Sequence, residues 1–376
     1  MGILPLTGGY AAAEAMRQIN PDVVAAYPIT PQTPIIEKFA EFVSDGLVDT
    51  EMICVESEHS AMSACVGSSA AGARTITASS SQGIALMFEI LPIVSSLRLP
   101  ILMEVAARAL SGPINIHCDH SDVMAVRDQG WIQIFCENAQ EVYDNTLLGL
   151  KLGERVKLPV MVIQDGFITS HSVERVETLE DDVVRKFIGD YKPSYSLLDT
   201  KKPITVGPFA LPDYYFEIKR QQDEAIRKSK KDYLSVGKML SKITKRKYNL
   251  FETYKIEDAD YVIIVSGSTA GTVKEVVDIK RNRGEKVGLM KIKLFRPFPG
   301  DELKDILEDK KTGVLDRSIN FGSYPSLYSE IRMITQDVNS YIYGLGGRDI
   351  YVNDVNKIFS DLKREKQKLK YVGLRE

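Results

Sequence analysis

Short apolar runs alternate with longer amphipathic stretches over the first ~170 residues of the chain. The runs contain few polar residues, which is typical of strands that are buried on both faces of a parallel sheet. Their ranges are Val23–Tyr27, Met52–Val55, Thr75–Ala78, Ile101–Ala106, Ile132–Phe135 and Val160–Gln164. Helical spacing is found between them, at Ala11–Ile19, Pro34–Val43, His59–Ala71, Gly83–Leu97 and Glu141–Val156. The alternation predicts an α/β domain with a parallel sheet covered on both faces.

Charged and aromatic residues replace this alternation between about residue 175 and residue 257. Here Phe216–Lys247 predicts a long, exposed helix, and its Lys and Arg residues are more typical of a solvated face than of a nucleic-acid site. Alternation resumes at Tyr261–Ser266 and ends with a helix expected at Val355–Lys368.

The length of 376 residues suits two domains. We expect residues 1–257 to form the first, with a core at 1–175 and a charged excursion at 176–257. Residues 258–376 are expected to form a second α/β domain.

Composition narrows the class of protein. The net charge of −3 gives no general attraction to nucleic acid or to an anionic membrane. No apolar run approaches the length of a membrane-spanning helix, and the amino terminus lacks the pattern of a secretory signal, so we expect a cytoplasmic protein. The four cysteines form no C-x-x-C pair, which argues against a zinc or iron–sulfur site made by this chain alone.

Loops that follow the strands of an open parallel sheet are the expected place for a ligand. The first is Tyr27–Pro34, in which three prolines stiffen the backbone around Thr30. Its hydroxyl near a helix amino terminus suits an anionic substrate group. Ordinary capping of that helix by Thr33 is an alternative, and both can hold.

Two further loops lead from a predicted strand into a predicted helix. Glu56 and Glu58 follow the second strand, and from spacing alone they are equally well explained as charges that favour a helix amino terminus. The loop Ser79–Gly83 could meet an anion or simply cap its helix, so we assign it no role.

The loop from Arg108 to Asp122 is the longest. Its Arg108 closes a strand, where a guanidinium can pair with a carboxylate through two hydrogen bonds. Four side chains in the loop look like metal ligands, but we favour structural polar contacts and predict no metal site: His117, Asp119, His120 and Asp122.

Familiar phosphate-binding motifs are missing from the sequence. It has no Gly-Asp-Gly segment of the kind that holds a magnesium-bound diphosphate, no G-x-x-x-x-G-K-[ST] loop and no G-x-G-x-x-G after a strand. The segment Gly344–Gly347 follows a strand but lacks the acidic residue that dinucleotide binding requires.

These loops and several other strings resemble the alpha subunits of 2-oxoacid:ferredoxin oxidoreductases, and the pyruvate-specific branch most closely. The matching strings run from Thr7 to Ile350: T-G-G-Y-A-A-A-E-A, Y-P-I-T-P, V-E-S-E-H-S-A, A-A-R-A-L-S, D-H-S-D-V-M-A-V-R-D-Q-G-W-I-Q, P-V-M-V-I-Q-D-G-F and G-L-G-G-R-D-I. The match is loose between 175 and 257.

The resemblance implies a fold and a role for each loop. It implies a pyrimidine-binding-type domain of a thiamine enzyme, followed by a transketolase C-terminal-like α/β domain. Glu58 matches the glutamate that bonds the aminopyrimidine ring of thiamine diphosphate, and Pro28 matches a position that lines the cofactor. Thr30 and Arg108 match residues that receive the substrate carboxylate, and Ile116 matches one beside the substrate methyl.

The implied reaction is oxidative decarboxylation of pyruvate with coenzyme A, giving acetyl-CoA and CO2, with electrons passing to ferredoxin. Partner chains of beta, gamma and delta type would supply the diphosphate–magnesium site and the [4Fe-4S] clusters, in line with the motifs missing here. Two alternatives remain open: an alpha subunit specific for a branched-chain or other 2-oxoacid, and a non-catalytic α/β binding or scaffold subunit.

Overall fold

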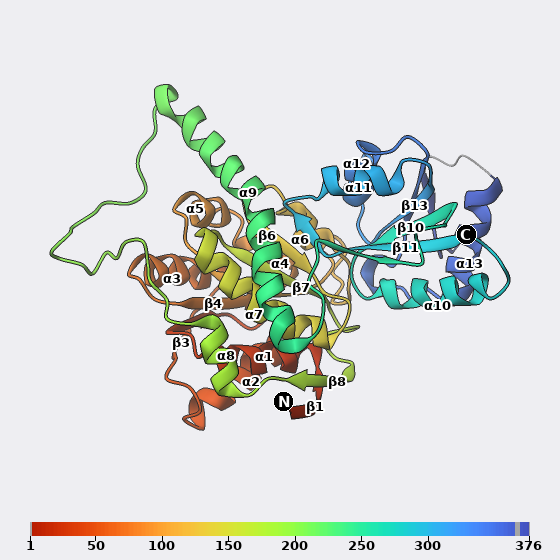
Figure 1. Cartoon of the computed structure of the whole chain (residues 1–376). Helices are drawn as coiled ribbons and strands as arrows, with labels where there is room; N and C mark the ends of the chain where they lie inside the picture. The colour runs from red at the N-terminus through yellow and green to blue at the C-terminus, as the bar shows by residue number, and fades with distance from the viewer. Residues whose placement is uncertain (1, 365–368, 376) are drawn as a thin grey trace.

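Two α/β units make up the computed structural model, which describes residues 2–364 and 369–375. The larger unit contains the amino terminus and the smaller one contains the carboxyl end (Figure 1). This arrangement confirms the α/β class predicted from the alternation of apolar runs and helical stretches.

Within the described residues the larger sheet has seven strands in the order β12-β6-β7-β5-β4-β2-β3. Six are parallel and come from the amino-terminal part: β2 (Val23–Ala26), β3 (Glu51–Cys54), β4 (Thr75–Ser79), β5 (Leu102–Ala107), β6 (Ile132–Phe135) and β7 (Val160–Asp165). Each lies within a residue or two of a predicted apolar run. The seventh, β12 (Leu294–Arg296), comes from the carboxy-terminal part, and we did not expect it here.

Helices cover both faces of this sheet, as predicted. One face packs against α1 (Gly8–Ile19), α2 (Thr33–Ser44) and α7 (Ala139–Val156), and the small side chains of α1 allow close packing. The other face is covered by α3 (Glu58–Ala70) and by three short helices: α4 (Ser81–Leu86), α5 (Leu91–Ser96) and α6 (Ser121–Ala125). The single helix predicted over Gly83–Leu97 was therefore wrong, because a turn at 87–90 separates α4 from α5.

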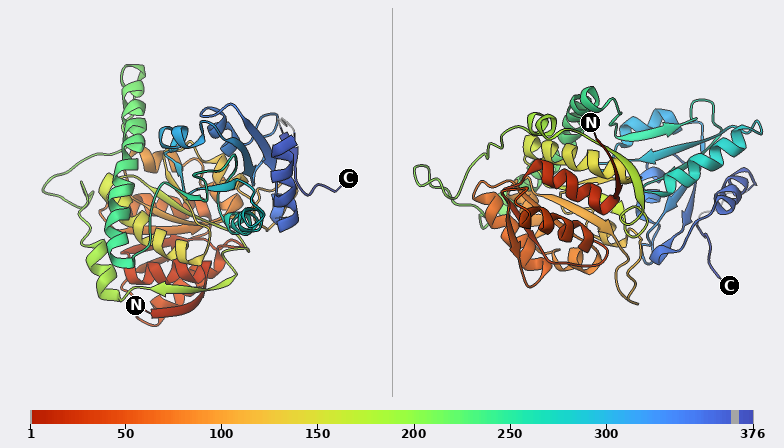
Figure 2. Two further views of the ribbon diagram at one scale, coloured as in Figure 1. Left: turned by 45° about the vertical axis from the view of Figure 1, so that its right-hand side comes forward. Right: turned by 90° about the horizontal axis from the view of Figure 1, so that it is seen from below.

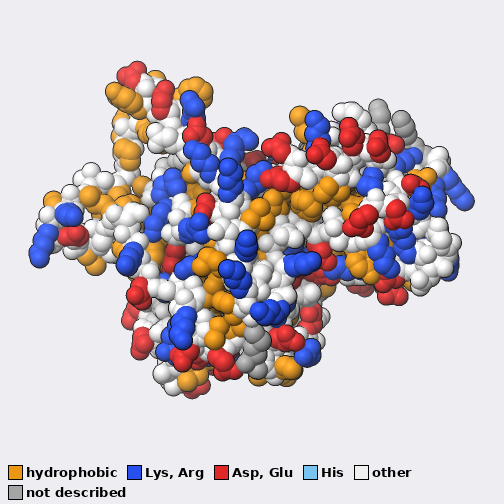
Figure 3. Space-filling model, in the orientation of Figure 1, with side chains coloured by type: hydrophobic (Ala, Val, Ile, Leu, Met, Phe, Trp, Pro, Cys, Tyr) orange, Lys and Arg blue, Asp and Glu red, His pale blue; other side chains and the backbone are white. Residues whose placement is uncertain are grey.

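The charged excursion wraps one side of the larger unit. A two-stranded ribbon joins β1 (Gly2–Thr7) to β8 (Val173–Thr178), and α8 (Asp181–Ile188) follows. The long helix α9 (Pro212–Thr244) then packs its second half on α7 through Tyr233, Val236 and Leu240. Its first half projects from the molecule (Figures 1 and 2), as the predicted exposed helix would. Exposed apolar residues near this end of the chain segment include Phe209 and Phe216. Figure 3 shows hydrophobic side chains at the projecting tip, mixed with charged ones.

The smaller unit has a sheet of six described strands in the order β15-β14-β13-β10-β11-β9. The strands are β9 (Phe251–Tyr254), β10 (Tyr261–Val265), β11 (Val287–Ile292), β13 (Lys311–Asp316), β14 (Val338–Ile342) and β15 (Leu369–Tyr371). The helices are α10 (Thr269–Arg281), α11 (Gly300–Leu307), α12 (Ser326–Arg332), α13 (Val352–Arg364) and the one-turn η1 (Leu345–Gly347).

Two differences from the sequence-based expectation concern this unit. Strand β9 precedes the expected boundary at residue 257 but pairs antiparallel with β11, so it belongs to the second sheet. The last helix was expected over Val355–Lys368; the structure shows it to Arg364, and 365–368 lie outside the described residues.

Buried charges join the two units. The ammonium group of Lys291, a residue only 2% exposed, contacts the carboxylates of Glu137, Glu141 and Glu252, and Lys293 lies 2.8 Å from Glu141. Burial alone would raise the pKa of Glu141, but the two lysines outweigh it and hold the pKa well below its ordinary value. Among the described helices, none combines the length and the apolar character required to cross a lipid bilayer.

Candidate active site

The loops after β2 and β5 meet at the carboxyl edge of the larger sheet. Arg108, the first residue after β5, donates from Nη1 to the carbonyl oxygen of Thr30 at 2.8 Å. Its Nε donates to the carbonyl oxygen of Asn115 at 2.9 Å. A guanidinium has five N–H donors, so these two bonds leave about three for a ligand. The structure thus brings together Thr30 and Arg108, which were predicted separately.

Arg108 is only 6% exposed, and this burial lowers the pKa of its guanidinium, with Asp122 acting in the opposite sense. An arginine stays charged in a protein even so. A nearly buried guanidinium with N–H groups left unbonded suits a carboxylate, because the pairing restores the interactions that water provided.

Asp122 fixes the shape of this edge. Its carboxylate accepts hydrogen bonds from the backbone N–H groups of Arg108 (2.9 Å), Ser81 (2.9 Å) and Val123 (2.7 Å). Complete burial raises its pKa to about 7. Asp122 therefore ties the loops after β4 and β5 together, in agreement with the structural role preferred from the sequence.

The remaining predicted residues on this side lie at the surface. Thr30 and Pro28 are exposed, and Ile116, next to Asn115, is 41% exposed. Their exposure leaves them accessible to a ligand or to a partner chain.

Glu58 lies in a different loop, after β3. It is the first residue of α3, follows the N-cap Ser57 and is 7% exposed. Within residues 2–364 and 369–375 we find no hydrogen bond to its carboxylate. Glu56, in contrast, is exposed and accepts a hydrogen bond from the Ser60 hydroxyl. The two glutamates that spacing could not distinguish therefore have different environments.

Gly83 makes room for Glu58. A Cβ added at Gly83 would lie 2.7 Å from Oε1 and 2.8 Å from Cγ of Glu58, and would clash with Oγ of Ser79. This hydroxyl is buried and has no hydrogen-bond partner in the described part of the chain. The Glu58 carboxylate thus lies in a cradle formed by the loop after β4, the loop to which the sequence assigned no role. The only sequence signal was a glycine in the first turn of a helix.

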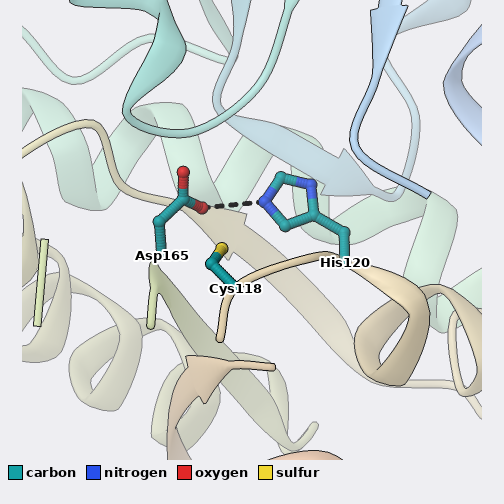
Figure 4. A group of neighbouring side chains, drawn as sticks. All are labelled: Cys118, His120 and Asp165. Carbon is teal, nitrogen blue, oxygen red and sulfur yellow. Dashed lines mark hydrogen bonds and ion pairs between the residues drawn. The ribbon is translucent and has the colours of Figure 1, made fainter. Parts of the chain in front are cut away.

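A second buried group lies where the two units meet (Figure 4). His120 Nε2 is 2.8 Å from Asp165 Oδ1, and Cys118 lies beside them. Arg317 Nη1 reaches Cys118 Sγ at 3.4 Å and Asp165 Oδ2 at 3.3 Å. Burial would raise the pKa of Asp165, but His120 and Arg317 outweigh it and lower this pKa. Because the Arg317 guanidinium already contacts both Cys118 and Asp165, the group does not suit a metal cation.

His117 and Asp119 do not join that group. His117 packs against the ring of Phe167, and Asp119 accepts hydrogen bonds from Ser121 and from the backbone of Gly346. The roles of Asp165 and Arg317 were missed from the sequence, because no local pattern links residues 152 positions apart.

The chain is an α/β protein whose candidate carboxylate and guanidinium sites lie in loops at the carboxyl edge of a parallel sheet, and comparison with known proteins shows its family. Residues 14–237 match the family described as pyruvate flavodoxin/ferredoxin oxidoreductase, thiamine diphosphate-binding. Residues 259–355 match pyruvate:ferredoxin oxidoreductase core domain II. The chain therefore belongs to the pyruvate:flavodoxin/ferredoxin oxidoreductase family, and the resemblance inferred from the sequence is confirmed.

Similar proteins include subunits of two named types. The chain is 55% identical to pyruvate synthase subunit PorA of Thermotoga maritima, over 99% of this chain and 98% of that subunit. It is 46% identical to ketoisovalerate oxidoreductase subunit VorA of Pyrococcus horikoshii, over 96% and 93%.

Among solved structures, the 2-oxoglutarate:ferredoxin oxidoreductase from Magnetococcus marinus has a similar fold. The TM-score is 0.77 at 22% identity, covering 96% of this chain and 65% of that one. That protein was solved with 2-oxoglutarate, coenzyme A and succinyl-CoA bound.

Proposed function

We propose that this chain is the alpha subunit of a pyruvate:ferredoxin oxidoreductase and supplies the aminopyrimidine side of its thiamine diphosphate site. The enzyme converts pyruvate and coenzyme A to acetyl-CoA and CO2, passes electrons to ferredoxin and works reversibly. The observation that carries this proposal is the Glu58 carboxylate, which is nearly buried and has no hydrogen-bond partner in the described chain. The 55% identity to a pyruvate synthase subunit supports it.

Glu58 is the proposed cofactor-binding and catalytic residue. Its carboxylate, held against Gly83 at the start of α3, fits an aminopyrimidine nitrogen that needs a hydrogen-bond partner. By holding a proton at that nitrogen, Glu58 would favour the imino tautomer of the ring, whose exocyclic nitrogen can act as a base. When bound, thiamine diphosphate supplies a nucleophilic thiazolium carbon and an electron sink for decarboxylation.

Arg108 and Thr30 are proposed to bind the substrate carboxylate. The spare N–H groups of Arg108 donate to the carboxylate oxygens, and the Thr30 hydroxyl adds a donor on the opposite loop. Ile116 supplies an apolar contact for the substrate methyl, and Pro28 lines the cofactor ring beside Thr30. These contacts orient the keto carbon and displace water from it.

The rest of the machinery is assigned to partner chains. We propose that beta-type, gamma-type and delta-type subunits complete a hetero-oligomer in the cytoplasm. They would hold the magnesium-bound diphosphate and the [4Fe-4S] clusters, and contribute contacts to coenzyme A. In support, the described residues offer no cysteine cluster, and the Arg317 guanidinium contacts Cys118 and Asp165 of the buried Cys118–His120–Asp165 group.

A branched-chain 2-oxoacid is the alternative substrate, favoured by the 46% identity to a ketoisovalerate oxidoreductase subunit. One methylene in an apolar pocket discriminates by only about 1–3 kcal/mol. Measuring kcat/KM for pyruvate and for 2-ketoisovalerate with the purified complex distinguishes the two; we expect pyruvate to be preferred.

The decisive test is Glu58→Ala in the complete complex. We expect pyruvate-dependent dye reduction to be abolished while the subunits still assemble, as followed by size-exclusion chromatography. Glu56→Ala is the matched control, since it removes the neighbouring glutamate, which is exposed, and should keep full activity. An active Glu58→Ala complex would refute the proposal.

A further inference from the structure

The glycine-rich segment Gly344–Gly347, which the sequence left without a role, lies in the carboxy-terminal unit after β14. We call it the glycine loop, and residues 108–120, between β5 and α6, the arginine loop. The two loops are far apart in the sequence but bond directly to each other.

Three hydrogen bonds join the two loops. The backbone N–H of Gly347 donates to the carbonyl oxygen of Cys118 at 2.6 Å, and that of Gly346 donates to the Asp119 carboxylate at 3.2 Å. In the other direction, Asn115 Nδ2 donates to the carbonyl oxygen of Gly346 at 3.1 Å. The contact therefore covers the middle and the end of the arginine loop.

Gly347 permits this close approach. Its φ is +80°, and a Cβ added there would clash with the Cβ of His117. Any side chain at 347 would therefore strain the backbone and push the arginine loop away. Gly322 provides a comparison: its φ of +78° is equally unfavourable for a side chain, but among the described residues no atom lies within 4 Å of an added Cβ.

Arg317 makes a further contact between the carboxy-terminal unit and the arginine loop. Its carbonyl oxygen accepts from the backbone N–H of His120 at 2.8 Å, while its buried guanidinium bonds Cys118 and Asp165. The end of the arginine loop is thus attached to β7 and to the carboxy-terminal unit together.

The contact reaches Arg108 through one residue. Nε of Arg108 donates to the carbonyl oxygen of Asn115, whose side chain is bonded to the glycine loop. Displacing Asn115 would remove one of the two bonds that orient the guanidinium. We propose that the glycine loop positions Arg108 for the substrate carboxylate, so that the carboxy-terminal unit takes part in substrate recognition. This inference rests on the proposed role of Arg108.

Gly347→Ala in the complete enzyme complex tests the inference, with Gly322→Ala as the control for backbone strain. We expect the KM for pyruvate to rise on the order of tenfold, since small displacements of binding groups have effects of this size. kcat at saturating pyruvate should change much less. Amide hydrogen exchange in residues 109–120 should become faster, and Gly322→Ala should alter neither KM nor this exchange.

Asn115→Ala is the second variant, because it removes a bond between the loops without backbone strain. It also removes the hydrogen bond that Asn115 Oδ1 accepts from the backbone N–H of His117 at 2.7 Å. It should raise KM in the same direction, and its effect should not add to that of Gly347→Ala if both act through one contact. Unchanged KM in both variants would overturn the inference, even if exchange became faster. Arg108→Ala separates the two proposals. If it raises the KM for pyruvate while the other variants do not, only the positioning role of the glycine loop is wrong. If Arg108→Ala saturates normally with pyruvate, the proposed substrate site itself is refuted.

Discussion

Gly83→Ala gives a demanding prediction because it adds one methyl group and removes no functional group. The methyl would lie 2.7 Å from Oε1 and 2.8 Å from Cγ of Glu58, whereas ordinary contacts begin at 3.4 Å. The Glu58 carboxylate must therefore withdraw by roughly 0.7 Å. A misplacement of about 1 Å at a reacting centre can cost on the order of 100-fold, or about 2.7 kcal/mol. We expect kcat to fall between about tenfold and 100-fold.

The assay is pyruvate-dependent dye reduction by the purified complex, with thiamine diphosphate affinity measured alongside. Alanine is a better helix former than glycine, by up to about 1 kcal/mol, so the helix itself should tolerate the change. Gly271→Ala in α10 is the matched control, because its added Cβ would meet its nearest neighbour at 3.5 Å. If Gly83→Ala kept kcat within twofold of the wild type and bound the cofactor normally, Glu58 would not be the group that the cradle positions.

Three other variants test separate parts of the structure. Arg108→Ala should mainly raise the KM for pyruvate, as measured by steady-state kinetics, because it removes a carboxylate partner; unchanged saturation would contradict the assignment. Glu104 lies fully buried in β5, and this burial raises its pKa to about 8. The folded protein therefore binds a proton at Glu104 more tightly than the unfolded chain does. The stability that this gives is complete below the ordinary pKa of 4.5 and is lost as the pH rises towards 8. Glu104→Gln should flatten this part of the stability profile, as followed by thermal unfolding of the complex between pH 5 and 8. Lys291→Met should destabilise the complex by about 1.5–3 kcal/mol at pH 7, because Glu137, Glu141 and Glu252 lose the buried cation that they share and keep only Lys274 and Lys293 as partners. As Glu141 has a lowered pKa, the wild type should lose this contribution as the pH falls below about 4.5.

Local pattern was enough to predict the sheet and the loops that carry the candidate site. Strands such as Ile132–Phe135 are buried on both faces, and their short length together with their β-branched and aromatic residues separates them from helices. The loops that hold Thr30, Glu58 and Arg108 followed from the rule that ligands bind beyond the carboxyl ends of parallel strands. The roles proposed for these residues came from the family resemblance, because a glutamate at a helix start has many explanations.

Contacts between distant segments could not be predicted in this way. The cradle around Glu58 depends on Gly83, and the attachment of the arginine loop depends on Gly347 and Arg317. Both the cradle and the attachment depend on which loops the fold brings into contact, and the pattern of a single sequence does not show which loops these are. Strand β9 was missed for a similar reason: four residues between charged segments pair with β11 only when the second sheet is present.

The short strand β12 restricts movement of the two units of this chain relative to each other. It leaves the carboxy-terminal unit and hydrogen-bonds to β6, with Leu294 opposite Ile134, so one sheet contains backbone from both units. Swinging the units apart would break main-chain bonds and expose the edge of that sheet. Within the proposed complex, we therefore expect motions that open and close the active site to come from the partner chains rather than from a hinge between the two units of this chain.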